Sequence, residues 1–212
     1  MKTGAHPSRR RSLFLAAAGI FAIVLTGCTG RGGGQLPPSP GFTGAAAFGF
    51  TFSCQDSGGL NPPTGELAIE LAYGDKGTSL FLGAPFGIHG TADVIDPVLE
   101  SQICAGQNPP PGGNELIFLG RYSLTSSAPS GFPASCPKRE TPTTPLCRFE
   151  VIVQDNDRNL APSPGDFFSI KLSTVTTRCD APIPDPTCSQ LPAASVFYAR
   201  AGYLSSGNLT VN

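Results

Sequence analysis

Apolar and polar residues alternate with a period of two along most of the chain after residue 45. Phe48, Phe50 and Phe52 share one face of such a strand, with small and hydroxyl residues between them. This period is typical of β-strands that bury one face, whereas no stretch keeps the 3.6-residue period of a helix. The pattern predicts strands over 45–53, 66–71, 78–82, 116–124, 149–153, 168–172, 195–204 and 208–211.

Turn-forming residues separate these strands, as in Asn61-Pro62-Pro63 and Gly74-Asp75-Lys76-Gly77. Short strands with hairpin-length links predict an all-β fold. Two architectures fit: an antiparallel β-sandwich of the immunoglobulin-like kind, or the same strands closed as a β-barrel. Longer loops at 85–113, 126–146 and 178–191 each hold or abut cysteines, so we expect disulfide bridges to limit their freedom.

The first 27 residues have the features of an export signal. Three arginines at 9–11 precede the apolar run 13–25, which is short of the roughly 20 apolar residues that span a bilayer comfortably. The run ends in Leu25-Thr26-Gly27-Cys28, which resembles the lipobox of bacterial lipoproteins. The resemblance implies cleavage before Cys28, acylation of that cysteine, and a cell-envelope protein held to the membrane by lipid.

Two alternatives concern the same segment. An ordinary secretory signal with a chance cysteine would give a protein without a lipid anchor. Arg10-Arg11-Ser12-Leu13-Phe14 also resembles a twin-arginine export signal, so the export route stays open. Thr29 stands where many inner-membrane lipoproteins carry aspartate, which favours the outer membrane if the organism has one.

Composition divides the exported part into a spacer and one domain. Residues 28–42 are rich in glycine and proline without apolar periodicity, which predicts a flexible tether. Residues 43–212 then form a single β-domain. The formal net charge of −1 and the 14% content of charged residues provide no basic patch for phosphates, so nucleic acid is excluded as an expected partner.

Six cysteines remain besides Cys28, an even number in a compartment where disulfides persist. Loop closure favours near neighbours, which predicts the pairs Cys54–Cys104, Cys136–Cys147 and Cys179–Cys188. An alternative joins Cys54 to Cys147 across the core, because both continue the inward phase of their strands. Metal binding would need clustered spacings such as C-x-x-C, and the sequence has none.

The candidates for chemistry are few. Asp155, Asp157 and Asp166 flank one turn and could bind Ca²⁺ in an extracellular loop, although the EF-hand pattern is absent and such residues also cap turns. His89 is the one histidine left after processing, and no nucleophile elbow surrounds it, so we interpret it as a solvent-exposed loop residue. We expect no cofactor.

Glycan binding usually draws on exposed aromatic rings. The chain has no tryptophan, and its four tyrosines all fall in strand-like segments, where packing is the commoner role: Tyr73, Tyr122, Tyr198 and Tyr203.

Three late stretches, 149–157, 164–172 and 203–209, resemble the end of a β-rich domain found in exported bacterial proteins. That domain has a pattern close to F-x-V-x-V-x-D-N-G-x-P-G-x-x-D-x-F-x-I-x-L, followed by a strand ending near G-x-L-x-x-G-N-I. The matching residues here are Phe149, Val151, Val153, Asp155, Asn156, Asp166, Phe168, Ile170, Leu172, Gly202, Leu204, Gly207 and Asn208. Asp157 stands where the family has glycine, and the spacing around Pro164-Gly165 differs. The resemblance implies the fold and no chemistry.

These observations predict a lipid-anchored envelope protein whose β-domain is a structural or interaction module and not an enzyme. Its expected partners are the membrane, through lipid, and an envelope protein or glycan. The alternatives are a module that binds glycan or calcium, and an envelope hydrolase that uses carboxylates of the long loops.

Overall fold

The computed structural model describes residues 27–56, 65–77, 82–92, 113–141, 144–156, 165–176 and 190–211. Within them, nine strands and one short 3-10 turn are present: β1 (Gly27–Leu36), β2 (Ala46–Asp56), β3 (Gly65–Asp75), β4 (Phe86–Thr91), β5 (Glu115–Leu124), β6 (Cys147–Gln154), β7 (Phe167–Ser173), η3 (Ala193–Ser195), β8 (Val196–Tyr203) and β9 (Ser206–Val211). The predicted all-β class is therefore confirmed.

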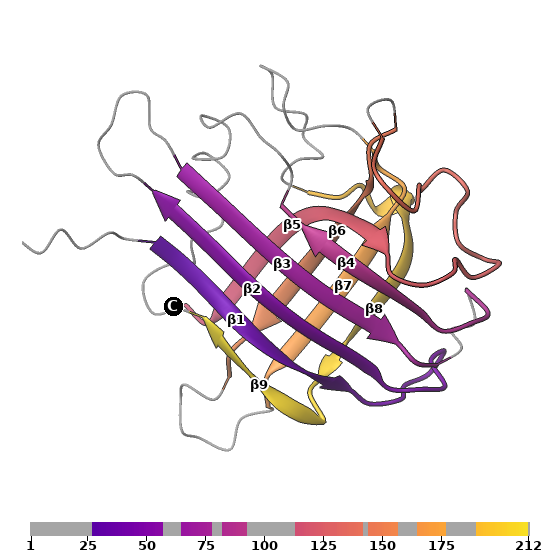
Figure 1. Ribbon diagram of the computed structural model, residues 1–212. Coiled ribbons are helices and arrows are strands. Elements are labelled where there is room, and N and C mark those ends of the chain that lie inside the picture. The colour runs from indigo at the N-terminus through magenta and orange to yellow at the C-terminus, as the bar shows by residue number, and fades with distance from the viewer. Residues whose placement is uncertain are drawn as a thin grey trace, which may run out of the picture.

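The strands form one antiparallel sheet in the order β8-β7-β6-β5-β4-β3-β2-β1-β9. From β1 to β8 each strand pairs with its neighbour in sequence, and β9 crosses back to pair with β1. Figure 1 shows that the sheet curls strongly, so that β5 to β7 cross behind β1 to β3. The core lies between these two halves of the same sheet.

Residues of the inward phase fill this core. The rings of Phe48 on β2 and Phe168 on β7 stack with their centroids 3.6 Å apart, and Phe52 lies 5.6 Å from Phe118 of β5. The apolar positions of the period-two pattern are buried: Phe48, Phe50, Phe52, Leu67, Ile69, Leu71, Leu116, Phe118, Tyr122, Phe149, Val151, Val153, Phe168, Ile170 and Leu172. The pattern thus predicted the core face correctly, because every second residue of a strand points to the same side.

The sheet bends between β4 and β5, where two glycines lie beneath the ring of Phe149. A Cβ atom on Gly120 would lie 2.3 Å from the Thr91 carbonyl oxygen, and one on Gly90 would lie 2.6 Å from the Phe149 ring. Only glycine allows so close an approach. The strand β4 lies in a stretch where we expected a loop. Gly87 and Gly90 leave this strand with only two large apolar residues on its inward face, too few to give an alternating pattern. The strand expected at 78–82 lies almost wholly outside the described residues.

The expected flexible tether is instead mostly a strand. Ten residues, Gly27–Leu36, form β1, which pairs with β2 on one side and β9 on the other. A Cβ atom on Gly32 would lie 2.6 Å from the Asn208 carbonyl oxygen, so glycine here permits close strand packing. The prediction of a spacer over 28–42 was wrong for this strand, since we took a glycine-rich composition as a sign of flexibility. The β-domain begins at β1.

A buried polar cluster fixes the segment after β1. Arg200 Nη2 on β8 donates to the carbonyl oxygens of Pro37 at 2.9 Å and Gly44 at 2.7 Å. Its Nη1 lies 2.9 Å from Asp75 Oδ1, and both side chains are almost fully buried. Tyr198 donates to the second oxygen of Asp75 at 2.8 Å. A buried ion pair is tolerated when further hydrogen bonds satisfy it. Here Nη2 of Arg200 and the Asp75 carboxylate have such bonds, whereas Nε and Nη1 of Arg200 are buried without a hydrogen bond, so the ion pair with Asp75 is the contact that holds Nη1.

Candidate functional site

His89 lies on β4 and not in a loop, which corrects the sequence interpretation, although it is solvent-exposed as expected. Its Nε2 atom is 2.7 Å from Oε2 of Glu70 on β3, and the side chains are 48% and 65% exposed. Ser123 of β5 lies opposite His89, but its hydroxyl donates to the backbone carbonyl of His89 at 3.4 Å. A serine nucleophile would need its hydroxyl group to be hydrogen-bonded to a ring nitrogen of the histidine. The three side chains therefore form a polar surface without an activated serine.

Two of the three calcium candidates hold the last strand in place. The Leu209 amide donates to Asp166 Oδ2 at 2.7 Å, and the Val211 amide donates to Asp155 Oδ2 at 3.2 Å. The second oxygen of Asp166 accepts the Asn156 amide at 3.0 Å. Both carboxylates are buried. We call this pair the β9 clamp.

The third candidate, Asp157, lies outside the described residues. Among the residues that the structure does describe, no group of three or more histidine, cysteine, aspartate or glutamate side chains could hold a metal ion. Asp155 and Asp166, the two aspartates of the D-N…D part of the pattern, are therefore the two residues of the β9 clamp. They connect the ends of β6 and β7 to the edge strand β9 through charge-assisted hydrogen bonds. Of the carboxylates in the three long loops, only Glu140 lies within the described residues.

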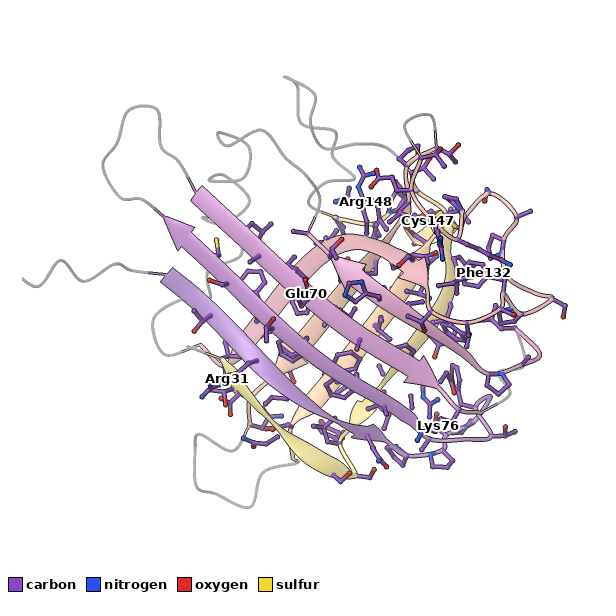
Figure 2. The ribbon with its side chains drawn as sticks, viewed as in Figure 1. Arg31, Glu70, Lys76, Phe132, Cys147 and Arg148 are labelled. Atoms are coloured by element: carbon purple, nitrogen blue, oxygen red, sulfur yellow. A yellow bond between two sulfur atoms is a disulfide. The ribbon has the colours of Figure 1, made fainter. Side chains whose placement is uncertain are left out.

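The cysteines fall into three groups. Cys136 and Cys147 form a disulfide, the pair that loop closure favoured, and the alternative of Cys54 with Cys147 was wrong. This bridge ties the loop after β5 to β6 at one end of the sheet, where Figure 2 shows Phe132 and Cys147. Cys54 is buried and disulfide-bonded, with its partner outside the described side chains. Cys104, Cys179 and Cys188 lie outside the described residues.

Three of the four tyrosines belong to the core. Burial raises the pKa of Tyr73, Tyr122 and Tyr198 above the ordinary tyrosine range, because the charged phenolate would lose its hydration. The Tyr122 hydroxyl donates to the Ser173 carbonyl at 3.2 Å, and those of Tyr73 and Tyr198 are hydrogen-bonded to each other. These rings therefore have packing roles and are closed to a glycan.

Tyr203 differs, because 51% of it is exposed at the end of β8. Its ring packs edge-on against Phe167, with centroids 5.6 Å apart. Ile117, which is 38% exposed, pairs with Ile152 on the same outer side of the sheet. Phe167 on β7 lies opposite Tyr203 on β8 and Gln154 on β6, and Ile152 lies two residues before Gln154 on the same face of β6. We call Ile117, Ile152, Phe167 and Tyr203 the outer patch.

Most of the outer patch was not predicted from the sequence, because the expected strands were defined by their inward residues alone. The signal was present: Ile117 interrupts the alternation between Leu116 and Phe118, and Phe167 directly precedes Phe168. An apolar residue at an outward position has no core to enter, so consecutive apolar residues in an otherwise alternating strand indicate an exposed apolar surface.

No known protein-family model, curated protein or solved structure matches the chain. Among the described residues there is no helix of sufficient length and apolar character to cross a membrane.

Proposed function

We propose that this protein is a lipid-anchored component of the bacterial cell envelope whose β-domain is a non-catalytic interaction module. The observation that carries the proposal is the outer patch, where Phe167, Tyr203 and Ile117 expose apolar surface on the outside of a well-filled core. Exposed aromatic and aliphatic groups that cluster in this way are typical of contact surfaces, and tyrosine is enriched at the energetic centres of interfaces.

The anchor in this proposal is lipid on Cys28, supported by the lipobox resemblance and by the absence of aspartate at position 29, which favours the outer membrane. The resemblance to the exported β-rich family remains part of the proposal. We also propose that the curled sheet is a closed barrel and not a sandwich. In support, the turn between the edge strands β8 and β9 is hydrogen-bonded to both ends of the sheet. The Leu204 N–H donates to the Asp166 carbonyl oxygen just before β7, and the Ser205 N–H donates to the Gln35 carbonyl oxygen on β1, each at 2.9 Å.

The interaction role is tested by photo-crosslinking in intact cells. A photoreactive phenylalanine analogue replaces Tyr203 in the full chain, and a matched control places it at Ala199, which is also exposed on β8. We expect covalent adducts to one envelope component from position 203 and few from position 199. Equal adduct yields at the two positions would overturn the proposal, because the outer patch would then be no more in contact than any other surface.

The anchor is tested separately with Cys28→Ser. No other described segment supplies a membrane-spanning helix, so this variant should leave the membrane fraction or keep its signal uncut. Normal processing together with continued sedimentation with membranes would refute the anchor and leave the role of the outer patch unaffected.

A second candidate is glycan binding at the outer patch. Tyr203 is the one tyrosine of the four candidates whose ring is exposed. On the same face of the sheet, on the other side of Phe167, Gln154 donates to Glu115 at 2.6 Å. An open ring two strands from amide and carboxylate groups suits a sugar, which stacks through its C–H face and hydrogen-bonds through its hydroxyls. Calorimetric titration with soluble peptidoglycan fragments tests this. Tyr203→Ala should weaken binding and Tyr203→Phe should retain it, whereas no heat with the native protein excludes it.

A further inference from the structure

The register of the first two strands places two cysteines directly opposite each other. Cys28 on β1 is the Cα partner of Cys54 on β2. Two and four residues further along β1, Gly30 and Gly32 lie opposite the buried residues Phe52 and Phe50. Because residues alternate between the faces of a strand, position 28 belongs to the same face of β1 as Gly30 and Gly32.

Cys54 is already bonded. It is 2% exposed and takes part in a disulfide. Since Cys136 and Cys147 bond to each other, its partner is one of four cysteines: Cys28, Cys104, Cys179 or Cys188. Loop closure along the chain favours Cys104, but the antiparallel pairing of β1 with β2 also places Cys28 opposite Cys54.

The ladder favours Cys28 as the partner. Directly opposed residues of antiparallel strands have Cα atoms about 4.5 to 5.5 Å apart, which falls within the range of about 4.4 to 6.8 Å that disulfides require. The β1–β2 ladder holds the two strands in this register from Gly27 to Leu36. A bridge between Cys28 and Cys54 would therefore not require any further part of the backbone to become ordered.

We propose that Cys28 bridges to Cys54 whenever its sulfur carries no lipid, so that lipidation and the cross-strand disulfide are alternative fates of one atom. In the bridge, each thiol loses a proton and the two sulfurs together give up two electrons. An oxidised dithiol protein of the exporting compartment accepts them and is reduced to two thiols. In the lipidated chain the same sulfur is a thioether, which has no proton to lose, and Cys54 must bond elsewhere. This exclusion rests on the proposed anchor, whereas the bridge itself does not.

The tryptic map of the chain makes the two fates distinguishable. Cleavage after lysine and arginine places Cys28, Cys54 and Cys104 in three separate peptides, 12–31, 32–76 and 77–121. The full chain is produced in two bacterial strains, one with active lipoprotein lipidation and one in which the lipid-transferring enzyme is blocked. Free thiols are alkylated, the protein is digested without reduction, and linked peptides are identified by mass spectrometry. In both samples, the link between 122–138 and 140–148 reports the Cys136–Cys147 bridge and hence a folded domain.

Without lipidation, we expect peptide 12–31 joined to 32–76. With lipidation, Cys28 should carry the lipid mass and 32–76 should no longer be joined to it. Alkylated Cys28 in the lipid-blocked strain would overturn the bridge while leaving the anchor intact. The bridge without any lipid in the lipidating strain would instead refute the anchor and retain the bridge.

A register control uses the double variant Cys28→Ser/Thr29→Cys in the lipid-blocked strain. Position 29 lies opposite Ser53 and on the other face of the sheet, so the displaced thiol should be recovered alkylated. A link between position 29 and Cys54 would show that the end of β1 is not held in register, and would overturn the argument on which the bridge depends.

Discussion

At the scale of single residues, the sequence predicts which side chains enter the hydrophobic core. It does not predict which polar side chains bond to one particular group far away in the sequence. The inward phase of Phe118 or Val151 follows from alternation alone. The cluster of Asp75, Tyr198 and Arg200 does not, because Asp75 is more than 120 residues from the other two and meets them only when β3 and β8 close around the core. The same limit applies to Asp155 and Asp166, whose acceptor role depends on the later strand β9.

The buried tyrosines predict an alkaline limit to stability. Their pKa values are raised by burial, so the folded state holds the phenolic protons more tightly than the unfolded state does. This stabilisation is complete below the ordinary tyrosine pKa of about 10 and is lost as the pH rises above it, by about 1.4 kcal/mol per pH unit for each tyrosine. Urea titrations followed by circular dichroism measure this slope.

Tyr122→Phe isolates one of these contributions. The variant should lose about 1 kcal/mol at neutral pH, because the hydrogen bond to Ser173 is absent. Above a pH of about 10 its free energy of unfolding should fall less steeply than that of the native protein, by about 1.4 kcal/mol per pH unit. An unchanged slope would show that Tyr122 ionises equally in the folded and unfolded chains.

At the scale of elements, the strands with large inward residues were predictable, whereas the strands built on glycine were not. Alternation identifies β2, β3, β6 and β7 because each places three or four bulky residues on one face. In β1 the inward positions 30, 32 and 34 are glycines, which leave room for neighbouring strands and therefore carry no hydrophobic signal. Such a strand can be recognised only once its partners β2 and β9 are known.

The β9 clamp predicts a local effect of Asp166→Ala. The variant loses two charge-assisted hydrogen bonds, to the Leu209 and Asn156 amides, each of which contributes about 1.5 to 3 kcal/mol. We expect a lower free energy of unfolding and, in hydrogen–deuterium exchange, faster exchange of the β9 amides than of those in β2. Uniform acceleration across both strands would show that Asp166 supports the whole sheet and does not hold β9 specifically.

The bend between β4 and β5 predicts that Gly120 tolerates no side chain. Gly120→Ala places a Cβ 2.3 Å from the Thr91 backbone oxygen, so the strands must separate, at a cost of about 1 to 3 kcal/mol. Gly165→Ala is the matched control, because its Cβ would meet no atom within 4 Å and surface changes usually stay within about 0.5 kcal/mol. Equal thermal stability of the two variants would contradict the close approach at Gly120.

At the scale of the whole molecule, composition and turn spacing were enough for the all-β class but not for the architecture. Sandwiches and barrels share short alternating strands, and they differ in whether the hydrogen-bond ladder is continuous. Here the ladder continues from β8 to β9 through all nine strands, and that continuity depends on β1, the glycine-rich strand. The overlooked strand β1 therefore also connects β9 to the rest of the sheet.

The same strand determines how the proposed anchor holds the domain. If lipid is attached to Cys28, it is attached to a residue within β1, and the next residue, Thr29, pairs with Ser53. The domain should then lie directly against the bilayer surface, since a folded strand cannot extend as a linker does. Eight glycine and serine residues inserted between Cys28 and Thr29 should add a flexible span of about 16 Å, from roughly 5 to 6 Å times the square root of the residue number. Energy transfer from a fluorophore at position 199 to labelled lipid should fall in the insertion variant, while lipidation and thermal stability stay unchanged. Equal transfer in both proteins would mean that the start of β1 already detaches from the sheet and acts as the tether that its composition suggests.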